Sequence, residues 1–334
     1  MPTTPGRIRS AHWGLGLVFS ACLTLVVCFV SVSLHGRFMH HAETVRQQFE
    51  ILYGQPLTFD GVTGPFPERA GRLLAPLLLR AVWAIGGGSA GRAFIAVRLL
   101  TAFVAFLAFW GAASALAGDW RAVVLGSVLL GNMLILSFNL PWEVPSDFPD
   151  VAFTCGFVWA ALQRRRWLLV ALVLWASTNR ESAAFGAVVW WCLYGVRDDW
   201  TLDLRETAYA GLLAAASYAF ALGLRWLQIG WTTSFQVVAL ANDWRETLGF
   251  LRHPSPFGWP GLLGAALLPP LAWAFMNIRH AGFEERRLLV AAALIAGITV
   301  LFGYITEPRV FLPAGTVLIL ACVAMERRVP VPAA

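Results

Sequence analysis

Apolar runs of roughly 20 residues recur along the whole chain, and they constrain its fold more than any other feature. The hydrophobic residues come in blocks and not in the narrow stripes of amphipathic helices. They make up 58% of the 334 residues, and the mean hydropathy is +0.65, more apolar than a soluble domain of this length needs. Blocks of this length are typical of helices that cross a bilayer. The sequence therefore predicts an all-α, polytopic membrane protein.

The basic residues argue against a nucleic-acid partner, although the formal net charge is +6. All 25 basic residues are arginine, and they stand singly or in small clusters at the ends of the apolar blocks. No segment alternates basic with aromatic side chains as a nucleic-acid-binding surface does. The absence of lysine is read as a matter of genome composition, but the planar guanidinium group also suits phosphate recognition.

Arginine clusters predict the orientation, because cytoplasmic loops of membrane proteins are enriched in basic residues. Arg7 and Arg9 place the start of the chain in the cytoplasm, and Arg164-Arg165-Arg166 marks the same side. Counting onward predicts a single domain, residues 1–334, with about ten membrane-spanning helices and both termini cytoplasmic. The predicted spans are Trp13–Leu34, Arg92–Leu116, Ala122–Leu140, a fourth ending before Arg164, Trp167–Ser177, Ala183–Leu193, Ala208–Leu224, an eighth ending near Arg279, Leu288–Ile305 and a tenth ending at Glu326.

Residues 35–91 contain the longest polar stretch and are predicted to form the first external loop. Within them, Ala42–Leu52 reads as a short amphipathic helix on the membrane surface. Leu73–Ile85 is apolar but only about 13 residues long, with Pro76 and Arg80 interrupting it. A crossing needs about 20 residues, so this segment is expected to be a re-entrant or interfacial half-helix.

The stretch Thr178–Ser182 interrupts the apolar run from Trp167 to Tyr194. The arms on either side hold about 11 residues each, so the turn between them must be recessed below the outer surface, or the bilayer thinned around it. An ionisable residue at that depth is costly unless it faces a cavity or a partner. We therefore expect Asn179, Arg180 and Glu181 to line a cavity. The alternative is a self-satisfied Arg180–Glu181 network that only ties two helices together.

Two further outer turns carry candidate site residues. Glu307-Pro308-Arg309 joins two apolar blocks, and the Arg309 guanidinium suits bidentate binding of phosphate oxygens. The alternative for Glu307 and Arg309 is a helix cap with an interfacial ion pair. Asp147 and Asp150 end an acidic, proline-rich outer loop, where the alternative is a pair of solvated charges. We expect these turns and the first external loop to line one site on one side of the bilayer.

A catalytic base is sought among the acids of the first external loop. Glu43 lies on the predicted amphipathic helix, which fixes its height over the bilayer. Asp60 precedes Gly61 within a turn-rich stretch, and its alternative role is to form a turn. The adjacent histidines His40 and His41 point to different faces of a helix, which is poor spacing for a metal, and no metal site is predicted.

Three short motifs accompany this acidic first loop. Arg72-Leu73-Leu74-Ala75-Pro76 opens the half-helix, and Glu307-Pro308-Arg309-Val310-Phe311-Leu312-Pro313 lies near the end of the chain. Asn179-Arg180-Glu181-Ser182 is similar to the Arg-Glu-Thr turn of many bacterial members of one class of enzymes. Together these features resemble the GT-C class of polytopic glycosyltransferases, which take sugars from polyprenyl-phosphate donors.

The resemblance implies an inverting hexosyl- or pentosyltransferase of the bacterial inner membrane. It would move sugar from a lipid-linked donor to a glycan, lipid or protein acceptor on the outer, periplasmic face. A first-loop carboxylate would deprotonate the acceptor, and external arginines, Arg72 among them, would hold the lipid phosphate as it leaves. No certain cofactor is implied, and a divalent cation is left open.

Two other kinds of membrane protein are the alternatives. A transporter or lipid flippase usually shows internal repeats and paired broken helices, whereas this sequence shows one recessed break and no repeat. A non-catalytic membrane subunit with the same fold would share every motif named above. Membrane lipids are expected to surround the protein under each reading.

Overall fold

The computed structural model describes residues 11–35, 57–59, 62–64, 72–86, 90–137, 146–199, 201–229, 259–302 and 308–326. Apart from one two-stranded antiparallel ribbon, β1 (Leu57–Phe59) and β2 (Val62–Gly64), the secondary structure of this part is helical, so the predicted all-α class is confirmed there. The α-helices are α1 (Ala11–His35), α3 (Leu74–Ile85), α4 (Ala90–Leu116), α5 (Trp120–Ser137), α6 (Asp147–Leu162), α7 (Arg166–Ser177), α8 (Phe185–Trp190), α9 (Leu204–Ile229), α12 (Trp259–Asn277), α13 (Phe283–Phe302) and α14 (Leu312–Glu326). Short helical turns are η3 (Glu181–Ala184), η4 (Trp191–Gly195), η5 (Ile278–His280) and η6 (Pro308–Phe311).

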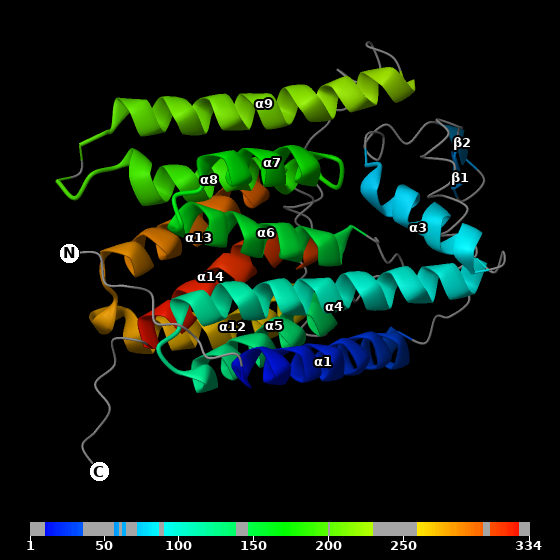
Figure 1. Ribbon diagram of the computed structural model, residues 1–334, viewed down its shortest axis with the longest axis horizontal. Helices are drawn as coiled ribbons and strands as arrows, with labels where there is room; N and C mark the ends of the chain where they lie inside the picture. Colours follow the sequence, from blue (N-terminus) through cyan, green and yellow to red (C-terminus); the bar gives the residue numbers. More distant parts are fainter. Residues whose placement is uncertain are drawn as a thin grey trace.

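Helix α14 forms the centre of the bundle, and its neighbours α4, α5, α6, α12 and α13 pack around it (Figure 1). Every residue from Leu312 to Met325 is buried. The sequence explains this position, because α14 is apolar on all sides, and a helix of that kind is stable only when it is covered on all sides.

Glycine lets α14 and α5 approach each other closely. A Cβ placed on Gly315 of α14 would overlap the Met133 sulfur of α5, and one on Gly126 of α5 would lie 2.7 Å from the Val323 side chain. Small residues at such crossings are typical of helices that pack in a membrane, because they allow the backbones to come together.

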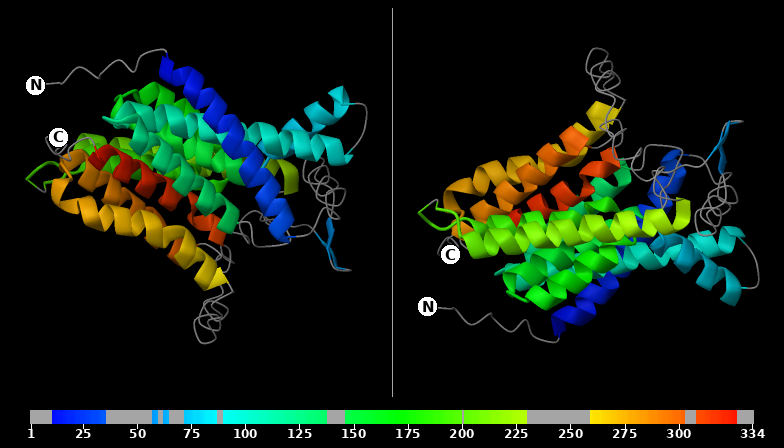
Figure 2. Two further views of the ribbon diagram at one scale, coloured as in Figure 1. Left: turned by 90° about the horizontal axis from the view of Figure 1, so that it is seen from below. Right: turned by 90° about the horizontal axis from the view of Figure 1, so that it is seen from above.

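The outer helices carry apolar side chains on their exposed faces. Figure 2 shows α1 lying diagonally across the outside of the bundle and α9 lying along another side. Phe29 of α1 and Leu227 of α9 are 74% and 77% exposed. Four segments of the described chain are long and apolar enough to cross a membrane: Trp13–Val30, Gly91–Leu116, Leu204–Gln228 and Arg309–Glu326. These features indicate a membrane protein.

Each predicted span coincides with helical structure, although the predicted boundaries needed correction. Some predicted spans coincide with the four long segments named above, and others coincide with shorter apolar helices, such as Trp120–Leu136 and Arg166–Ser177. The count of ten spans therefore stays a prediction. Helix α9 begins at Leu204, four residues before the predicted seventh span, because Asp203 caps it. The Glu206 N–H donates to Asp203 Oδ1 at 3.2 Å, and this hydrogen bond lowers the pKa of that carboxyl.

The segment predicted as a half-helix, 73–85, is helical as α3, and its re-entrant or interfacial placement stays a prediction. It is continuous across Pro76 and Arg80, which were expected to interrupt it. Pro76 lies in the first helical turn, where the missing N–H would have had no helical partner in any case. Leu79 of α3 packs against Phe94 of α4 in a small apolar cluster of its own. The two-stranded ribbon was not predicted, and the amphipathic segment 42–52 lies outside the described residues.

Candidate functional site

Buried charged side chains gather at the end of the bundle where α6 and α14 begin and where α7 and α9 end (Figure 1). Asp147 lies at the centre of this group, and its side chain is fully buried. Arg180 Nη1 is 2.8 Å from Asp147 Oδ1, and Arg309 Nη1 is 4.0 Å from Asp147 Oδ2. Asp150 Oδ2 lies 3.9 Å from the same nitrogen of Arg180. Two buried carboxylates thus share the charge of two arginines.

The first turn of α6 positions both aspartates. Asp147 and Asp150 lie near the positive end of the helix dipole, where carboxylates are stabilised. The Asp150 amide donates to the Ser146 carbonyl at 3.1 Å. The Asn179 side-chain amide donates to that same carbonyl at 2.9 Å, and the Ser182 hydroxyl donates to Asp150 Oδ1 at 2.5 Å. The turn between α7 and η3 is therefore fastened to the start of α6.

Glu181 links this turn to two further parts of the chain. Arg72 Nη2 donates to Glu181 Oε2 at 3.1 Å, and Arg225 near the end of α9 donates to Glu181 Oε1. The backbone adds a second tie, since the Leu74 amide donates to the Thr178 carbonyl at 3.0 Å. Glu181 thereby holds the residue before α3 and the end of α9 against the same turn.

We refer to the seven side chains joined in this way as the arginine–carboxylate cluster. Its members are Arg72, Asp147, Asp150, Arg180, Glu181, Arg225 and Arg309. Among the described residues the cluster holds four arginines and three carboxylates. Guanidinium groups gathered in a partly buried site are suited to an anion, above all to phosphate.

The structure brings together most of the residues that the sequence singled out. Arg72, Asp147, Asp150, Asn179, Arg180, Glu181 and Arg309 all lie at this end of the bundle. Glu43, Asp60 and Glu307 lie outside the described residues. The structure therefore does not test which of Glu43 and Asp60 is the base, and it does not test the role predicted for Glu307.

Two sequence interpretations are corrected at this site. Asp147 and Asp150 are not solvated loop charges, because both are buried and belong to the first turn of α6. The seventh span was predicted to end at Leu224, which left Arg225 outside it, whereas α9 continues to Ile229 and brings Arg225 to Glu181. The signal for Arg225 was its position at the end of an apolar run, where a charge within reach of the bilayer needs a partner.

Two buried polar atoms beside the cluster are available to a ligand. Ser146 and Asn179 are 3% and 1% exposed. Ser146 Oγ and Asn179 Oδ1 have no hydrogen-bond partner among the described residues. Buried polar atoms normally find partners, so atoms of this kind are candidates for contact with a bound molecule. The Ser146 hydroxyl is able to donate to an oxyanion, whereas Asn179 Oδ1 only accepts and suits a donor such as a hydroxyl group of the bound molecule.

The described carboxylates do not fit the divalent cation that the sequence left open. Within the part of the chain that the structure describes, no group of three or more His, Cys, Asp or Glu side chains is arranged to hold a metal ion. Asp147 and Asp150 already face Arg180, whose positive charge would repel a cation. No step of the chemistry is therefore assigned to a metal.

No protein-family model, no curated protein and no solved structure matches this chain. The residues of the cluster and their place in the fold are therefore what indicates a function.

Proposed function

We propose that this protein is an integral membrane glycosyltransferase of the GT-C type. It would transfer a sugar from a polyprenyl-phosphate donor, with inversion, to an acceptor on the periplasmic face of a bacterial inner membrane. In this proposal ten helices span the bilayer, both termini are cytoplasmic, and α3 is a re-entrant half-helix beside the site. The observation that carries the proposal is the arginine–carboxylate cluster, which gathers four guanidinium groups at one end of the bundle.

The chemistry of the donor explains why such a cluster would be useful. When the sugar leaves, negative charge develops on the polyprenyl phosphate, and cations that are already in place stabilise that charge most in a site with little water. Arg309 is 5% exposed and lies 4.0 Å from Asp147, and its planar guanidinium group suits a pair of phosphate oxygens. Asp147 and Asp150 hold the arginines in position and do not act as the base, since both already face Arg180.

The base is assigned to Glu43 in preference to Asp60. In the sequence, the Asp60-Gly61 pair is typical of a turn, so Asp60 has a ready role as a turn former. Glu43 belongs to the predicted amphipathic segment, which would fix its height over the bilayer. Glu43 is therefore the first-loop carboxylate proposed to deprotonate the acceptor.

A non-catalytic membrane subunit is the second candidate function. The observation in its favour is that every carboxylate of the cluster already faces an arginine of the cluster. Such a network is also what five neighbouring segments would need in order to hold together without binding anything. The two candidates differ in whether the arginines bind a lipid phosphate.

Replacement of Arg309 by lysine tests the proposal directly. The ammonium group keeps the charge but cannot form two parallel hydrogen bonds to phosphate. We expect binding of a polyprenyl-phosphate sugar to weaken about tenfold or more, since a charge-assisted hydrogen bond contributes about 1.5 kcal/mol or more. Binding would be measured per folded molecule on the purified protein, together with its unfolding temperature.

Arg121→Lys is the matched control, because Arg121 is exposed at the start of α5, at the other end of the bundle. It should bind donor as the wild type does. If Arg309→Lys lowers only the amount of folded protein and leaves the donor affinity unchanged, Arg309 has a structural role and the non-catalytic candidate is favoured.

A further inference from the structure

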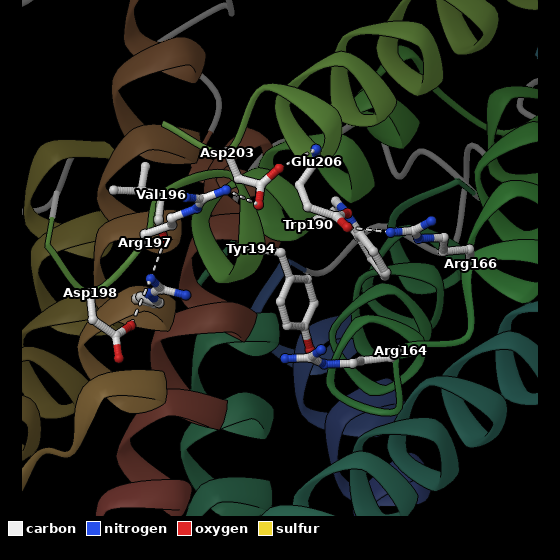
Figure 3. Close-up of a pocket in the computed structure, with 10 residues that line it drawn as sticks. Arg164, Arg166, Trp190, Tyr194, Val196, Arg197, Asp198, Asp203 and Glu206 are labelled. Carbon is white, nitrogen blue, oxygen red and sulfur yellow. Dashed lines mark hydrogen bonds and ion pairs between the residues drawn. The ribbon is translucent and has the colours of Figure 1, made fainter. Parts of the chain in front are cut away.

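A cavity of about 590 Å³ lies at the opposite end of the bundle from the arginine–carboxylate cluster (Figure 3). Its walls come from the end of α6, the start of α7, the turns around η4, the start of α9 and the first turn of α13. The lining residues are Arg164, Arg166, Trp190, Tyr194, Val196, Arg197, Asp198, Asp203, Glu206 and Arg287. Sites for small molecules commonly have volumes in the range of roughly 300–1,000 Å³. An inference about this cavity does not depend on the proposed function.

The acids that line the cavity are all engaged with arginines. Arg197 Nη2 is 3.2 Å from Asp203 Oδ2, and Arg287 Nη2 is 3.4 Å from Asp198 Oδ1. The third acid, Glu206, forms an ion pair with Arg166 and also accepts a hydrogen bond from the Trp190 indole at 3.0 Å. Each of these three arginines is thus paired with one acid of the lining. The positive charge of the fourth lining arginine is not balanced by an acid of the lining.

The fourth arginine is Arg164, whose guanidinium carbon lies 4.7 Å from the centre of the Tyr194 ring (Figure 3). No carboxylate of the described chain lies within ion-pair distance of it. Tyr194 itself is fixed, because its hydroxyl donates to the Ala161 carbonyl at 2.8 Å. Arg164 is thus an arginine on the cavity wall, held against an aromatic ring and not against an acid.

The backbone at Arg164 is unusual for this residue type. Its φ angle is 51°, in the left-handed region, and it is the first residue beyond the C-cap of α6. The Arg164 amide donates to the Ala161 carbonyl at 2.8 Å and the Arg165 amide to the Ala160 carbonyl at 2.9 Å. Helices that end with this pair of bonds usually carry glycine where Arg164 stands, because a side chain there is strained. Strain of this kind gathers at functional positions.

We propose that this cavity binds a phosphate group and that Arg164 is the cation that contacts it. The lining residues carry one positive charge in excess, four arginines against three acids, which matches a singly charged phosphate. Arg287 donates to the carbonyls of Leu193 and Val196 and so fixes one wall. Trp190 and Tyr194 exclude water from the other wall, and this strengthens the attraction between guanidinium and phosphate. The phosphate belongs either to a phospholipid headgroup or to a soluble ion.

The test compares Arg164→Gly with Arg165→Gly in the full chain, reconstituted in lipid nanodiscs. Arg165 lies in the same turn, but its guanidinium stacks on Trp159 at 5.4 Å and does not line the cavity. One arm adds radiolabelled inorganic phosphate to nanodiscs of phosphatidylcholine alone, with binding read by equilibrium dialysis. The other arm contains one-fifth phosphatidylglycerol and no added phosphate, with retained lipid counted by native mass spectrometry.

We expect saturable binding by the wild type in one of the two arms. Arg164→Gly should weaken that binding tenfold or more while its unfolding temperature stays equal or rises, because glycine relieves the strained backbone. Arg165→Gly should bind as the wild type does. Binding in the first arm identifies a soluble phosphate, and binding in the second identifies a lipid headgroup.

Three results would overturn the proposal. The first is the absence of saturable phosphate or phosphatidylglycerol binding by the wild type in both arms. The second is binding that Arg164→Gly leaves unchanged, which would show that Arg164 does not contact the ligand. The third is a fall in binding that Arg165→Gly shares equally, since that would report on the turn and not on the cavity.

Discussion

Asp147 shows how the fold accommodates a charge that it buries completely. Removing a carboxylate from water is costly, and the cost is offset only when a cation and hydrogen bonds replace the water. Arg180 at 2.8 Å and Arg309 at 4.0 Å provide that charge. Asp147 is therefore stable in the interior only together with its ion pair. Removing one partner is expected to lower the free energy of unfolding more than removing both partners.

A double-mutant cycle on Arg180 and Asp147 measures this dependence. Arg180→Gln leaves Asp147 buried next to a neutral side chain and should lower the free energy of unfolding by about 3–5 kcal/mol. Arg180→Gln combined with Asp147→Asn should cost clearly less than the sum of the two single changes. The free energies would be measured by denaturant unfolding in detergent, with Arg121→Gln as an exposed control. Additive losses would show that the two charges are not coupled.

The sequence predicted the members of this cluster other than Arg225. Arg180, Glu181 and Arg309 were found because charges near apolar runs are rare and need partners. The ion pairs themselves were not predictable, since they join residues at least 30 positions apart, as Arg180 with Asp147 and Glu181 with Arg72. Only packing of the helices decides such pairs.

At the scale of the helices, the apolar blocks of the sequence predicted where the helices lie. Local capping interactions determine where each helix begins and ends. The start of α6 was read as a loop because it contains Pro149, although proline is tolerated in the first turn of a helix. The end of α9 was set too early because Arg225 was taken as a loop residue. The β-ribbon was missed because each strand has only three residues, too few for an alternating pattern to stand out.

The close approach of α14 to α5 predicts the effect of enlarging one glycine. Gly315→Leu places a side chain where the Met133 sulfur lies, and overpacking of this kind typically destabilises by about 1–3 kcal/mol. Gly297→Leu on α13 is the control, because a Cβ there meets nothing within 4 Å and leucine favours a helix more than glycine does. Thermal unfolding of the two variants would separate packing from helix propensity. Equal unfolding temperatures would show that α14 does not depend on this contact.

At the scale of the whole molecule, the two ends of the bundle carry different chemistry. Charged groups from α6, α7, α9 and the segments before α3 and α14 meet in the arginine–carboxylate cluster at one end. The arginines that charge counting placed in the cytoplasm, such as Arg164 and Arg166, surround the cavity at the other end. The proposed orientation puts the cluster on the periplasmic side, where the lipid-linked donor would be used.

The most direct measurement is sugar transfer from a panel of polyprenyl-phosphate sugars in liposomes, by the wild type, Glu43→Gln and Asp60→Asn. The glutamine keeps the size of Glu43 but removes the basic oxygen, so turnover should fall by about 10²-fold or more while donor binding survives. Asp60→Asn should keep its activity. Loss of transfer in Asp60→Asn alone would move the base to Asp60 and leave the enzyme class standing. A wild-type protein that transfers no sugar from any donor of the panel, yet carries a lipid or solute across the liposome membrane, would contradict the account.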